Sequence, residues 1–233
     1  MTYSSYLLSI LAGCLIWISA TEARADEWCV PTTAPSITVR PSTDDISYNF
    51  SLSKKQLDHF DITTVSPYAN NVITDVGGLM KGGIETQQKM NFGILTNQTT
   101  GQVCFWHDSI DVFIHIKPTI YVASEFPEGS CMHNAILEHE QKHVTVDREI
   151  VNKYAQLIGS ALQADVARYR IYGPAPLSQQ PALESQLKTR IQSLIGMYTT
   201  QMSDERRNRQ QQIDNLGEYE RVNHMCPNEK PHE

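Results

Sequence analysis

Two histidines and a glutamate in the second half of the chain have the spacing of a metal-binding motif. His139, Glu140 and His143 form the pattern H-E-x-x-H, in which residues four apart lie on one face of a helix. The Cβ atoms of two such histidines are about 5–6 Å apart, which suits two ligands of one tetrahedral zinc ion. Zinc lowers the pKa of its water toward about 7, and a nearby carboxylate can accept the released proton. We therefore predict one Zn²⁺ held by His139 and His143, with Glu140 as the general base.

The residues around the motif favour a covered site over a solvated helix face. At 100° per residue, an apolar stripe runs along the predicted helix, formed by Leu137, Val144, Val151 and Ile158. Glu140, His143 and Asp147 lie along one flank of this stripe. The alternative interpretation is a surface or structural helix that is rich in histidine and glutamate.

A zinc peptidase site needs a third protein ligand. If the chain reverses near Ala175, residues about 35 positions on either side face each other, and 210–218 then lie opposite the motif. Asp214 is our first candidate for this ligand and Glu218 the second, while Glu205 remains open. For each of these acids, a solvated position on a charged helix is the alternative.

Two further acids follow the motif on the same helix. Asp147 is predicted to accept a hydrogen bond from an imidazole or to pair with a nearby base, although from its position it could also bind metal. Glu149 stands where the metzincin peptidases have their last histidine. That class needs glycine where this chain has Val146, so we expect the helix to continue and the metzincin pattern to fail.

The elements that position these residues are two long helices. A stretch from 134, with Asn134 as the expected N-cap, to 170 contains no proline and predicts the first helix. A Gly-Pro-Ala-Pro segment at 173–176 ends it. The second helix is predicted over 182–216, with an apolar stripe at Leu183, Leu187, Ile191, Leu194, Tyr198 and Met202. Together they predict an antiparallel helical hairpin.

The region from 36 to 126 indicates strands. Segments 37–39 and 46–52 are extended, and glycines at 77–78 and 82–83 are expected to form turns. In 110–117, alternation predicts a half-buried strand with Val112, Ile114 and Ile116 on one face. Pro118 is expected to interrupt the ladder, which makes 119–122 an edge or sheet-switching strand. Segment 80–97 is left unassigned.

The first 25 residues and the cysteines indicate export. An apolar run at 6–20 followed by Ala-Arg-Ala at 23–25 has the form of a cleavable signal peptide, and it is short for a membrane span. Cys14 lies in a lipoprotein-like box, which leaves a lipid anchor as the minor alternative. Cys29, Cys104, Cys131 and Cys226 remain after cleavage. Four cysteines in an oxidising compartment predict two disulfides of undetermined connectivity, and four free buried thiols are the alternative.

Composition and the absence of certain motifs argue against several classes of protein. The chain has 233 residues, 40% of them hydrophobic, and a formal net charge of -7. This composition predicts one folded domain, and the acidic balance argues against nucleic-acid binding. The absence of a glycine-rich phosphate loop and of a G-x-S-x-G motif argues against nucleotide-dependent enzymes and serine hydrolases. His107 and His115 are expected in strands, and His133 near the start of the first helix.

These features together resemble a known family. The leader, the strand region around Cys104 and 110–122, and the sequence NAILEHEQKHVTV at 134–146 running into a long helix are similar to a bacterial domain family of unknown function, whose members are described as predicted secreted zinc-dependent proteases. The likeness covers about the last 130 residues. It implies zincin-type chemistry, with His139 and His143 as ligands and Glu140 as base. The family is expected to have Tyr-Asp and a downstream His near the end of the second helix, where this chain has Ile213, Asp214 and Tyr219.

The interpretation is an α+β protein with a signal peptide at 1–25 and a single zincin-like domain at 26–233. Its strand-rich half, 26–126, packs on the helical hairpin of 127–233 that carries the motif. We expect a periplasmic or secreted zinc metallopeptidase that acts on a peptide or protein substrate, with no membrane span after signal removal, and with 110–117 or 119–122 as an edge strand that pairs with extended substrate. The alternatives are a non-catalytic envelope-binding or structural protein, without metal or with a structural zinc.

Overall fold

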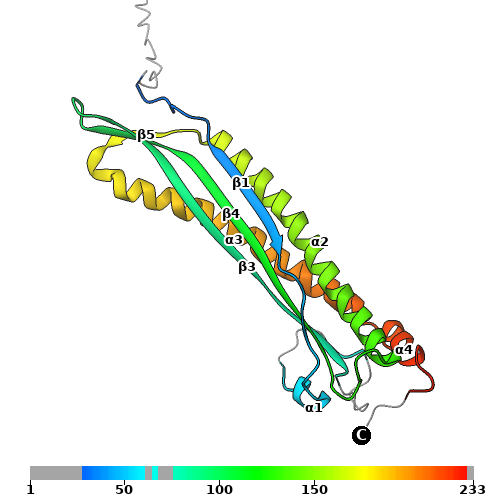
Figure 1. The fold of residues 1–233 in the computed structure, drawn as a ribbon. Helices are drawn as coiled ribbons and strands as arrows, with labels where there is room; N and C mark the ends of the chain where they lie inside the picture. Colours follow the sequence, from blue (N-terminus) through cyan, green and yellow to red (C-terminus); the bar gives the residue numbers. More distant parts are fainter. Residues whose placement is uncertain (1–27, 61–64, 68–75, 230–233) are drawn as a thin grey trace, which may run out of the picture.

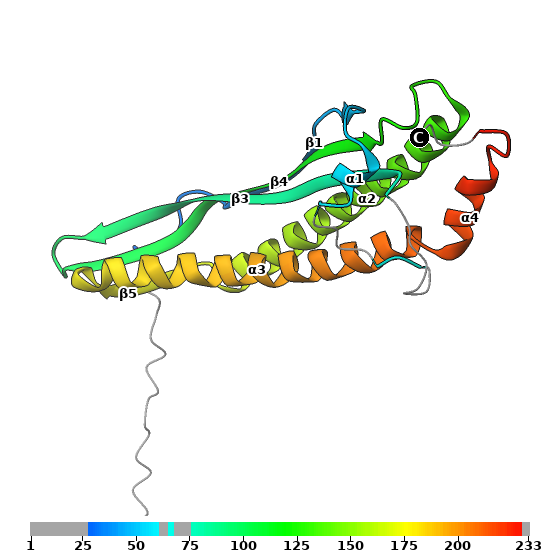
Figure 2. The same ribbon diagram turned by 90° about the horizontal axis from the view of Figure 1, so that it is seen from below.

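The protein has a two-layer α+β fold, in agreement with the predicted class. The computed structural model describes residues 28–60, 65–67 and 76–229. A five-stranded sheet forms one layer, and two long helices lie along one of its faces (Figures 1 and 2). The strands are β1 (Ser36–Thr43), β2 (Ser47–Asn49), β3 (Gly78–Asn97), β4 (Gln102–Val122) and β5 (Tyr172–Pro176); the helices are α1 (Lys54–Leu57), α2 (Cys131–Arg168), the 3-10 helix η1 (Leu177–Gln179), α3 (Gln180–Ile213) and α4 (Leu216–His224).

Strand β4 is the centre of the sheet. It pairs with β3 in antiparallel register along its whole length, and with β1 and β2 in parallel register. Because β1 and β3 both pair with residues 109–116 of β4, they lie on opposite sides of it. β4 therefore offers no free edge to a substrate, and the expectation that 110–117 or 119–122 is an edge strand is wrong.

The alternation predicted for 110–117 is confirmed. Val112, Ile114 and Ile116 are fully buried, whereas Phe113 and Lys117 on the other face are exposed. The buried face packs against residues of both long helices, including Ile150 and Ile191. This apolar layer between sheet and helices fixes the position of α2 and α3 on the sheet.

Pro118 does not interrupt β4, because its missing N–H falls where no donor is needed. The Asp44 N–H donates to the Ile116 carbonyl at 3.0 Å, so the backbone groups of Ile116 face the β1 side, and those of Pro118 two residues later face the same side. On that side the pairing with β1 ends at Ile116, and the pairing with β2 begins at Thr119. The proline thus lies at the junction between two neighbouring strands.

The glycines expected to form turns lie largely within β3. Gly78, Gly82 and Gly83 all belong to this strand, which also contains the unassigned segment 80–97. The turn between β3 and β4 is instead at 98–101. There the Asn97 side chain accepts from the N–H groups of Thr99 and Thr100, and Gly101 has a φ of 65°. Glycine pairs alone cannot distinguish a turn from a strand. At these positions the long pairing with β4 keeps the chain extended. Of the predicted strand 46–52, only β2 is formed.

Helix α2 begins three residues before the predicted N-cap. The Ser130 side chain accepts from the N–H of His133, and the Glu229 carboxylate accepts from the N–H groups of Cys131 and Met132, both at 2.8 Å. A carboxylate at a helix N-terminus is favourable because the first N–H groups have no partner within the helix. The predicted N-cap Asn134 is therefore wrong, because Ser130 caps the helix one turn earlier. The contribution of Glu229 could not be predicted from local capping rules, since this residue is far from α2 in the sequence.

Helix α3 follows α2 after a strand instead of a simple turn. Residues of the Gly-Pro-Ala-Pro segment pair with β4 as β5. Of the predicted stripe, Leu187, Ile191 and Met202 are buried, and the other three residues are half-buried in the apolar clusters. Arg190 near the start of α3 pairs with Asp165 near the end of α2, at 2.7 Å. The contacts at the opposite ends of both helices form the site described below.

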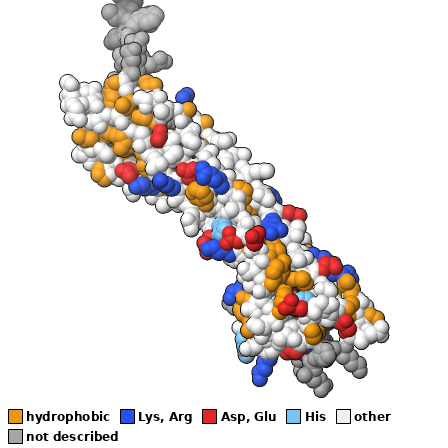
Figure 3. Space-filling view, in the orientation of Figure 1, with side chains coloured by type: hydrophobic (Ala, Val, Ile, Leu, Met, Phe, Trp, Pro, Cys, Tyr) orange, Lys and Arg blue, Asp and Glu red, His pale blue; other side chains and the backbone are white. Residues whose placement is uncertain are grey.

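Two disulfides are present, as predicted. Cys29 is joined to Cys104, and Cys131 to Cys226. Such bonds are compatible with an extracellular or secreted protein. Among the described residues, no helix combines the length and the apolar character needed to cross a bilayer. The predicted signal peptide and Cys14 lie outside the described residues. On the face shown in Figure 3, acidic and basic side chains are interspersed along the elongated molecule.

Candidate metal centre

Three side chains from two distant parts of the chain meet at one point. His139 and His143 project from one face of α2, and Asp214 is the residue that ends α3. The Asp214 Oδ1 atom is 3.2 Å from His139 Nε2 and 3.1 Å from His143 Nε2, and the two Nε2 atoms are 3.3 Å apart. The three atoms form a nearly equilateral triangle.

The dimensions of this triangle fit a metal ion. Zinc bound at about 2.0–2.1 Å in tetrahedral geometry holds its ligand atoms about 3.3 Å apart. One ligand atom of each residue lies within 4.8 Å of the others, and all three residues are buried. The group His139, His143 and Asp214 could therefore bind a metal ion, with one coordination position left for a non-protein ligand.

The second ring nitrogen of His139 faces an acid that is itself held by two bases. His139 Nδ1 is 3.3 Å from Glu218 Oε1, which accepts from Lys142 Nζ and from Arg221 Nη2, both at 2.7 Å. These contacts, of which the Arg221 hydrogen bond is the strongest, lower the pKa of Glu218 to about 2. Glu218, the second candidate ligand, therefore lies behind His139 as an ionised acceptor and outside the triangle.

The second ring nitrogen of His143 faces an amide. Its Nδ1 atom makes a short hydrogen bond to Gln210 Oε1. Gln210 lies within the region that the sequence placed opposite the motif, but only acids were considered there, so this residue was missed. Ring nitrogens of metal-binding histidines commonly have such acceptors, which hold the imidazole in place.

Glu140 lies buried beside the triangle. Burial raises the pKa of its carboxyl group, while the neighbouring His139 and His143 and a backbone hydrogen bond from Met80 act in the opposite direction. Strand β3 comes close at this point, since a Cβ on Gly78 would be 3.0 Å from Glu140 Oε1. The carboxylate is thus fixed between the α2 motif and the start of β3.

The electrostatics of the group favour a bound cation. Burial alone lowers the pKa values of His139 and His143, but the hydrogen bond to Asp214 and the charge of Glu140 outweigh it, so both pKa values are raised. The four side chains are only 5% to 8% exposed. Two carboxylates and two imidazoles enclosed in this way attract positive charge, which a metal ion or protons would supply.

The other acids considered in the sequence analysis form ion pairs with basic residues outside the triangle. Asp147 is fully buried and pairs with Arg206 at 2.7 Å, which is one of the three possibilities given for it above. Glu149 pairs with Arg209, and Glu205 pairs with Lys153 at 2.6 Å and accepts from Tyr154. The helix continues through Val146, so the metzincin pattern fails as predicted. None of these three acids joins the triangle.

The remaining histidines with predicted positions lie outside the group. His133, near the start of α2, contacts the Phe126 carbonyl, and His115 on β4 contacts Ser42 on β1. His107, also on β4, is 1% exposed, and within the described structure neither of its ring nitrogens has a hydrogen-bond partner. Their distribution leaves His139 and His143 as the histidines of the site.

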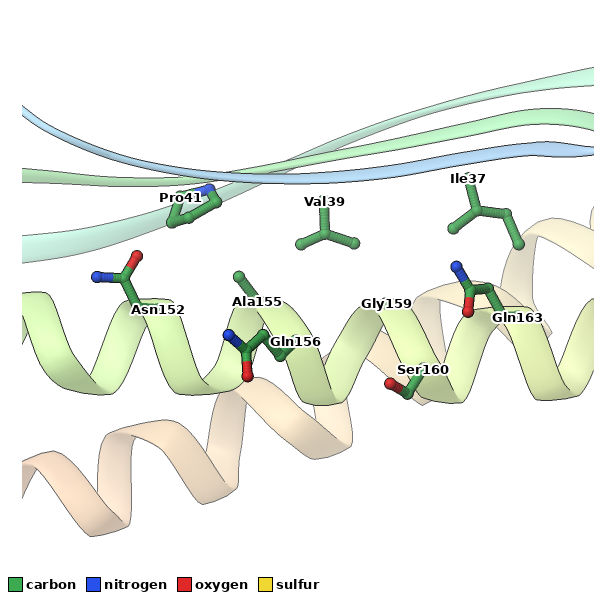
Figure 4. Close-up of a pocket in the computed structure, with 9 residues that line it drawn as sticks. All are labelled: Ile37, Val39, Pro41, Asn152, Ala155, Gln156, Gly159, Ser160 and Gln163. Atoms are coloured by element: carbon green, nitrogen blue, oxygen red, sulfur yellow. The ribbon is translucent and has the colours of Figure 1, made fainter.

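A groove of about 440 Å³ lies elsewhere, between β1 and α2 (Figure 4). It is lined on the strand side by Ile37, Val39 and Pro41, and on the helix side by Asn152, Gln156 and Gln163 together with small residues. This lining carries no formal charge and no metal-binding side chain. The groove is therefore separate from the triangle.

Comparison with known proteins gives no relative. A scan against protein-family models, a search of curated proteins and a search of solved structures each found no match. The chemistry of the site must therefore be inferred from its own geometry.

Proposed function

We propose that the protein is an exported zinc-dependent peptidase. In this proposal His139, His143 and Asp214 hold the metal, and Glu140 is the general base. The observation that carries it is the triangle of two Nε2 atoms and one carboxylate oxygen, with sides of 3.1–3.3 Å, next to a buried glutamate. The position of the motif on α2, packed against α3 and beside the start of β3, supports it further.

Each residue has a role that its surroundings support. When bound, zinc would supply Lewis acidity and lower the pKa of a water toward about 7. Glu140 is placed to accept a proton from that side and to return it to the leaving amine. The Met80 N–H orients the carboxylate, and burial excludes bulk water from it. The start of β3 replaces β4 as the strand beside the site.

The first test is the metal content of the protein from residue 26 onward, measured by mass spectrometry together with three variants. We expect one zinc per chain in the wild type and in Glu140→Gln, and none in His143→Ala or Asp214→Ala. Asp204→Asn is the matched control, since this exposed acid on α3 pairs with Arg207 at the surface. The absence of zinc from the wild type, even after incubation with the metal, would refute the proposal.

The second test is hydrolysis of denatured casein and of a quenched fluorescent peptide library. We expect Glu140→Gln to keep zinc and to lose at least about 100-fold in rate, as general base catalysis contributes roughly 10²–10⁴-fold. If this variant cleaved as fast as the wild type, Glu140 would not be the base.

The burial of the site favours one other candidate, a zinc-stabilised module without catalysis. Side chains that are 5% to 8% exposed are typical of closed structural sites, which use four protein ligands. This candidate predicts stoichiometric zinc without hydrolysis of any substrate, and unfolding upon chelation. A protein that loses zinc reversibly and cleaves peptides only in the zinc-bound form would exclude it.

A further inference from the structure

A line of buried and partly buried hydrogen bonds connects His143 to the backbone of β3. Arg206 on α3 donates to the Gly82 carbonyl at 2.9 Å and to both carboxylate oxygens of Asp147, at 2.7 and 2.9 Å. Gln210 donates from Nε2 to Asp147 Oδ1 at 2.6 Å and accepts from His143 Nδ1. Asp147 is fully buried and Gln210 is 5% exposed. The line begins at the Gly82 carbonyl in the sheet and ends at His143 in the candidate metal centre.

The chemistry of each side chain determines which group donates and which accepts in every hydrogen bond of the line. A guanidinium only donates and a carboxylate only accepts, so Asp147 must receive from both Arg206 and Gln210. The Gln210 Nε2 atom also donates to the His143 carbonyl at 3.1 Å. Exchanging the amide oxygen and nitrogen would place an oxygen against a carboxylate and a carbonyl. The amide oxygen is therefore forced to face His143.

An oxygen acceptor at Nδ1 determines the state of the other ring nitrogen. A neutral imidazole carries one proton, and two acceptors face the His143 ring: Gln210 Oε1 at Nδ1 and Asp214 Oδ1 at Nε2. Asp214 Oδ1 can receive its hydrogen bond from His139 Nε2 at 3.2 Å, which leaves the His143 proton at Nδ1 for Gln210. The Nε2 atom, which is 3.1 Å from Asp214 Oδ1, is then left with its lone pair directed into the triangle. We propose that Gln210, oriented by Asp147 and Arg206, is a positioning residue that holds His143 in the tautomer able to bind a metal.

The line also explains why this acceptor is an amide. Glu218 can face His139 Nδ1 as an ionised carboxylate because Lys142 and Arg221 both donate hydrogen bonds to it. At Gln210 the base that orients the network, Arg206, already donates to Asp147. A second carboxylate at this position would lie about as close to Asp147 as the present amide does, and the two charges would repel.

The test compares Gln210→Met with Gln210→Glu and a control. Methionine has a similar length but no strong acceptor, whereas glutamate restores an acceptor oxygen at the cost of repulsion with Asp147. Gln212→Met is the matched control, because this glutamine on the same helix is exposed. The primary measurement is the ¹⁵N shift of the His143 ring nitrogens in the metal-free protein, in alkaline buffer where the imidazole is neutral.

We expect the Nδ1–H form in the wild type, in Gln210→Glu and in the control, and a shift toward the Nε2–H form in Gln210→Met. Zinc affinity, measured by competition with a chelating dye, should fall about 10- to 100-fold in Gln210→Met. Retention of the Nδ1–H form in a folded Gln210→Met variant would overturn the proposal. A loss of this form in Gln210→Glu as well would assign the effect to packing and would overturn it too.

The consequence for zinc rests on the proposed function, but the tautomer does not. If the wild type holds the Nδ1–H form and binds no zinc, the positioning proposal stands and the peptidase proposal fails. If Gln210→Met does not fold, the wild-type tautomer alone decides, since an Nε2–H form there contradicts the orientation of Gln210.

Discussion

At the scale of the residue, the position of Glu140 depends on a glycine of β3. A Cβ on Gly78 would lie 2.3 Å from Ile136 Cγ2, 3.0 Å from Glu140 Oε1 and 3.1 Å from the Tyr121 carbonyl. The shortest of these contacts means that any other residue would force the Ile136 side chain to move, and the other two contacts are tight. The missing side chain thus allows the strand to approach the helix closely enough for the Met80 N–H to reach the carboxylate.

We expect Gly78→Ala to destabilise the protein by about 1–3 kcal/mol, as overpacking does, and to reduce hydrolysis while zinc is retained. Urea unfolding, metal content and rate would be measured together. Gly83→Ala is the control, because a Cβ at Gly83 meets nothing within 4 Å. Equal effects of the two substitutions would contradict this explanation.

His107 gives a residue-scale prediction away from the site. Burial lowers the pKa of this histidine; the charge of Asp165 acts against this to a smaller extent, and the charge of Arg190 adds to it. The unfolded chain therefore takes up a proton at its ordinary pKa of about 6.5, before the folded protein does. His107 then contributes nothing unfavourable above this pH, and stability is lost as the pH falls below it toward the lowered value.

We expect His107→Leu to remove part of this loss. The free energy of unfolding of wild type and variant would be compared by urea titration at several pH values between 7 and 5, a range chosen about the ordinary pKa. The variant should gain relative to the wild type as the pH falls. His115→Gln, on the half-buried outer face of the same strand, controls for loss of a histidine. A difference that does not vary with pH would contradict the prediction.

At the scale of the element, α4 is held against the start of α2 by covalent and polar contacts. The disulfide between Cys131 and Cys226 joins them, and Glu229, three residues beyond it, caps α2. Asp214 and Glu218 lie between α3 and this bond. The segment that carries both acids is thus anchored on each side, by α3 before it and by the disulfide after it.

Replacing Cys131 and Cys226 by alanine should cost about 2–5 kcal/mol of stability and also lower zinc affinity, since Glu218 and Asp214 lose an anchor. Chelator competition and urea unfolding would measure the two effects. The other pair, Cys29 and Cys104, joins the start of β4 to the chain before β1, at the far end of the molecule (Figure 1). Its removal should affect stability alone, and equal losses of zinc affinity would refute the argument.

At the scale of the whole molecule, the proposed zinc would connect the two helices at the end opposite the ion pair between Arg190 and Asp165. The pair between Arg190 and Asp165 joins α2 and α3 at one end, and the triangle joins them at the other. The apolar layer between sheet and helices lies along the length between these points. A metal ion that binds only the folded protein stabilises the entire fold. The proposed zinc would do so because the side chains that hold it come from both helices.

Zinc at 100 times its dissociation constant should therefore stabilise the protein by about 2.7 kcal/mol, seen as a rise in the thermal midpoint that increases with zinc concentration. A chelator should reverse the rise, and His143→Ala should abolish it. Calorimetry of wild type and variant, with and without zinc, makes the measurement. A midpoint that zinc does not change would show that the folded protein has no preference for the metal.

Features that depend on neighbours along the chain were determined by the sequence itself. The spacing of His139 and His143 fixes both on one helical face, and the alternation of Val112, Ile114 and Ile116 fixes a half-buried strand. These patterns follow from the helical and extended repeats, which act over a few residues. The number of disulfides followed in the same way from the cysteine count, and the approximate region opposite the motif followed from helix length.

Only the tertiary structure decided which partners meet across long separations. It placed Asp214 in the triangle and Glu218 behind His139, brought Gln210 to His143, paired Cys29 with Cys104, and made β4 the central strand despite Pro118. Each of these outcomes depends on the register between elements far apart in sequence, and a shift of one residue would turn a different side chain inward. Local patterns contain no information on that register, because it is determined by how the sheet and helices pack together.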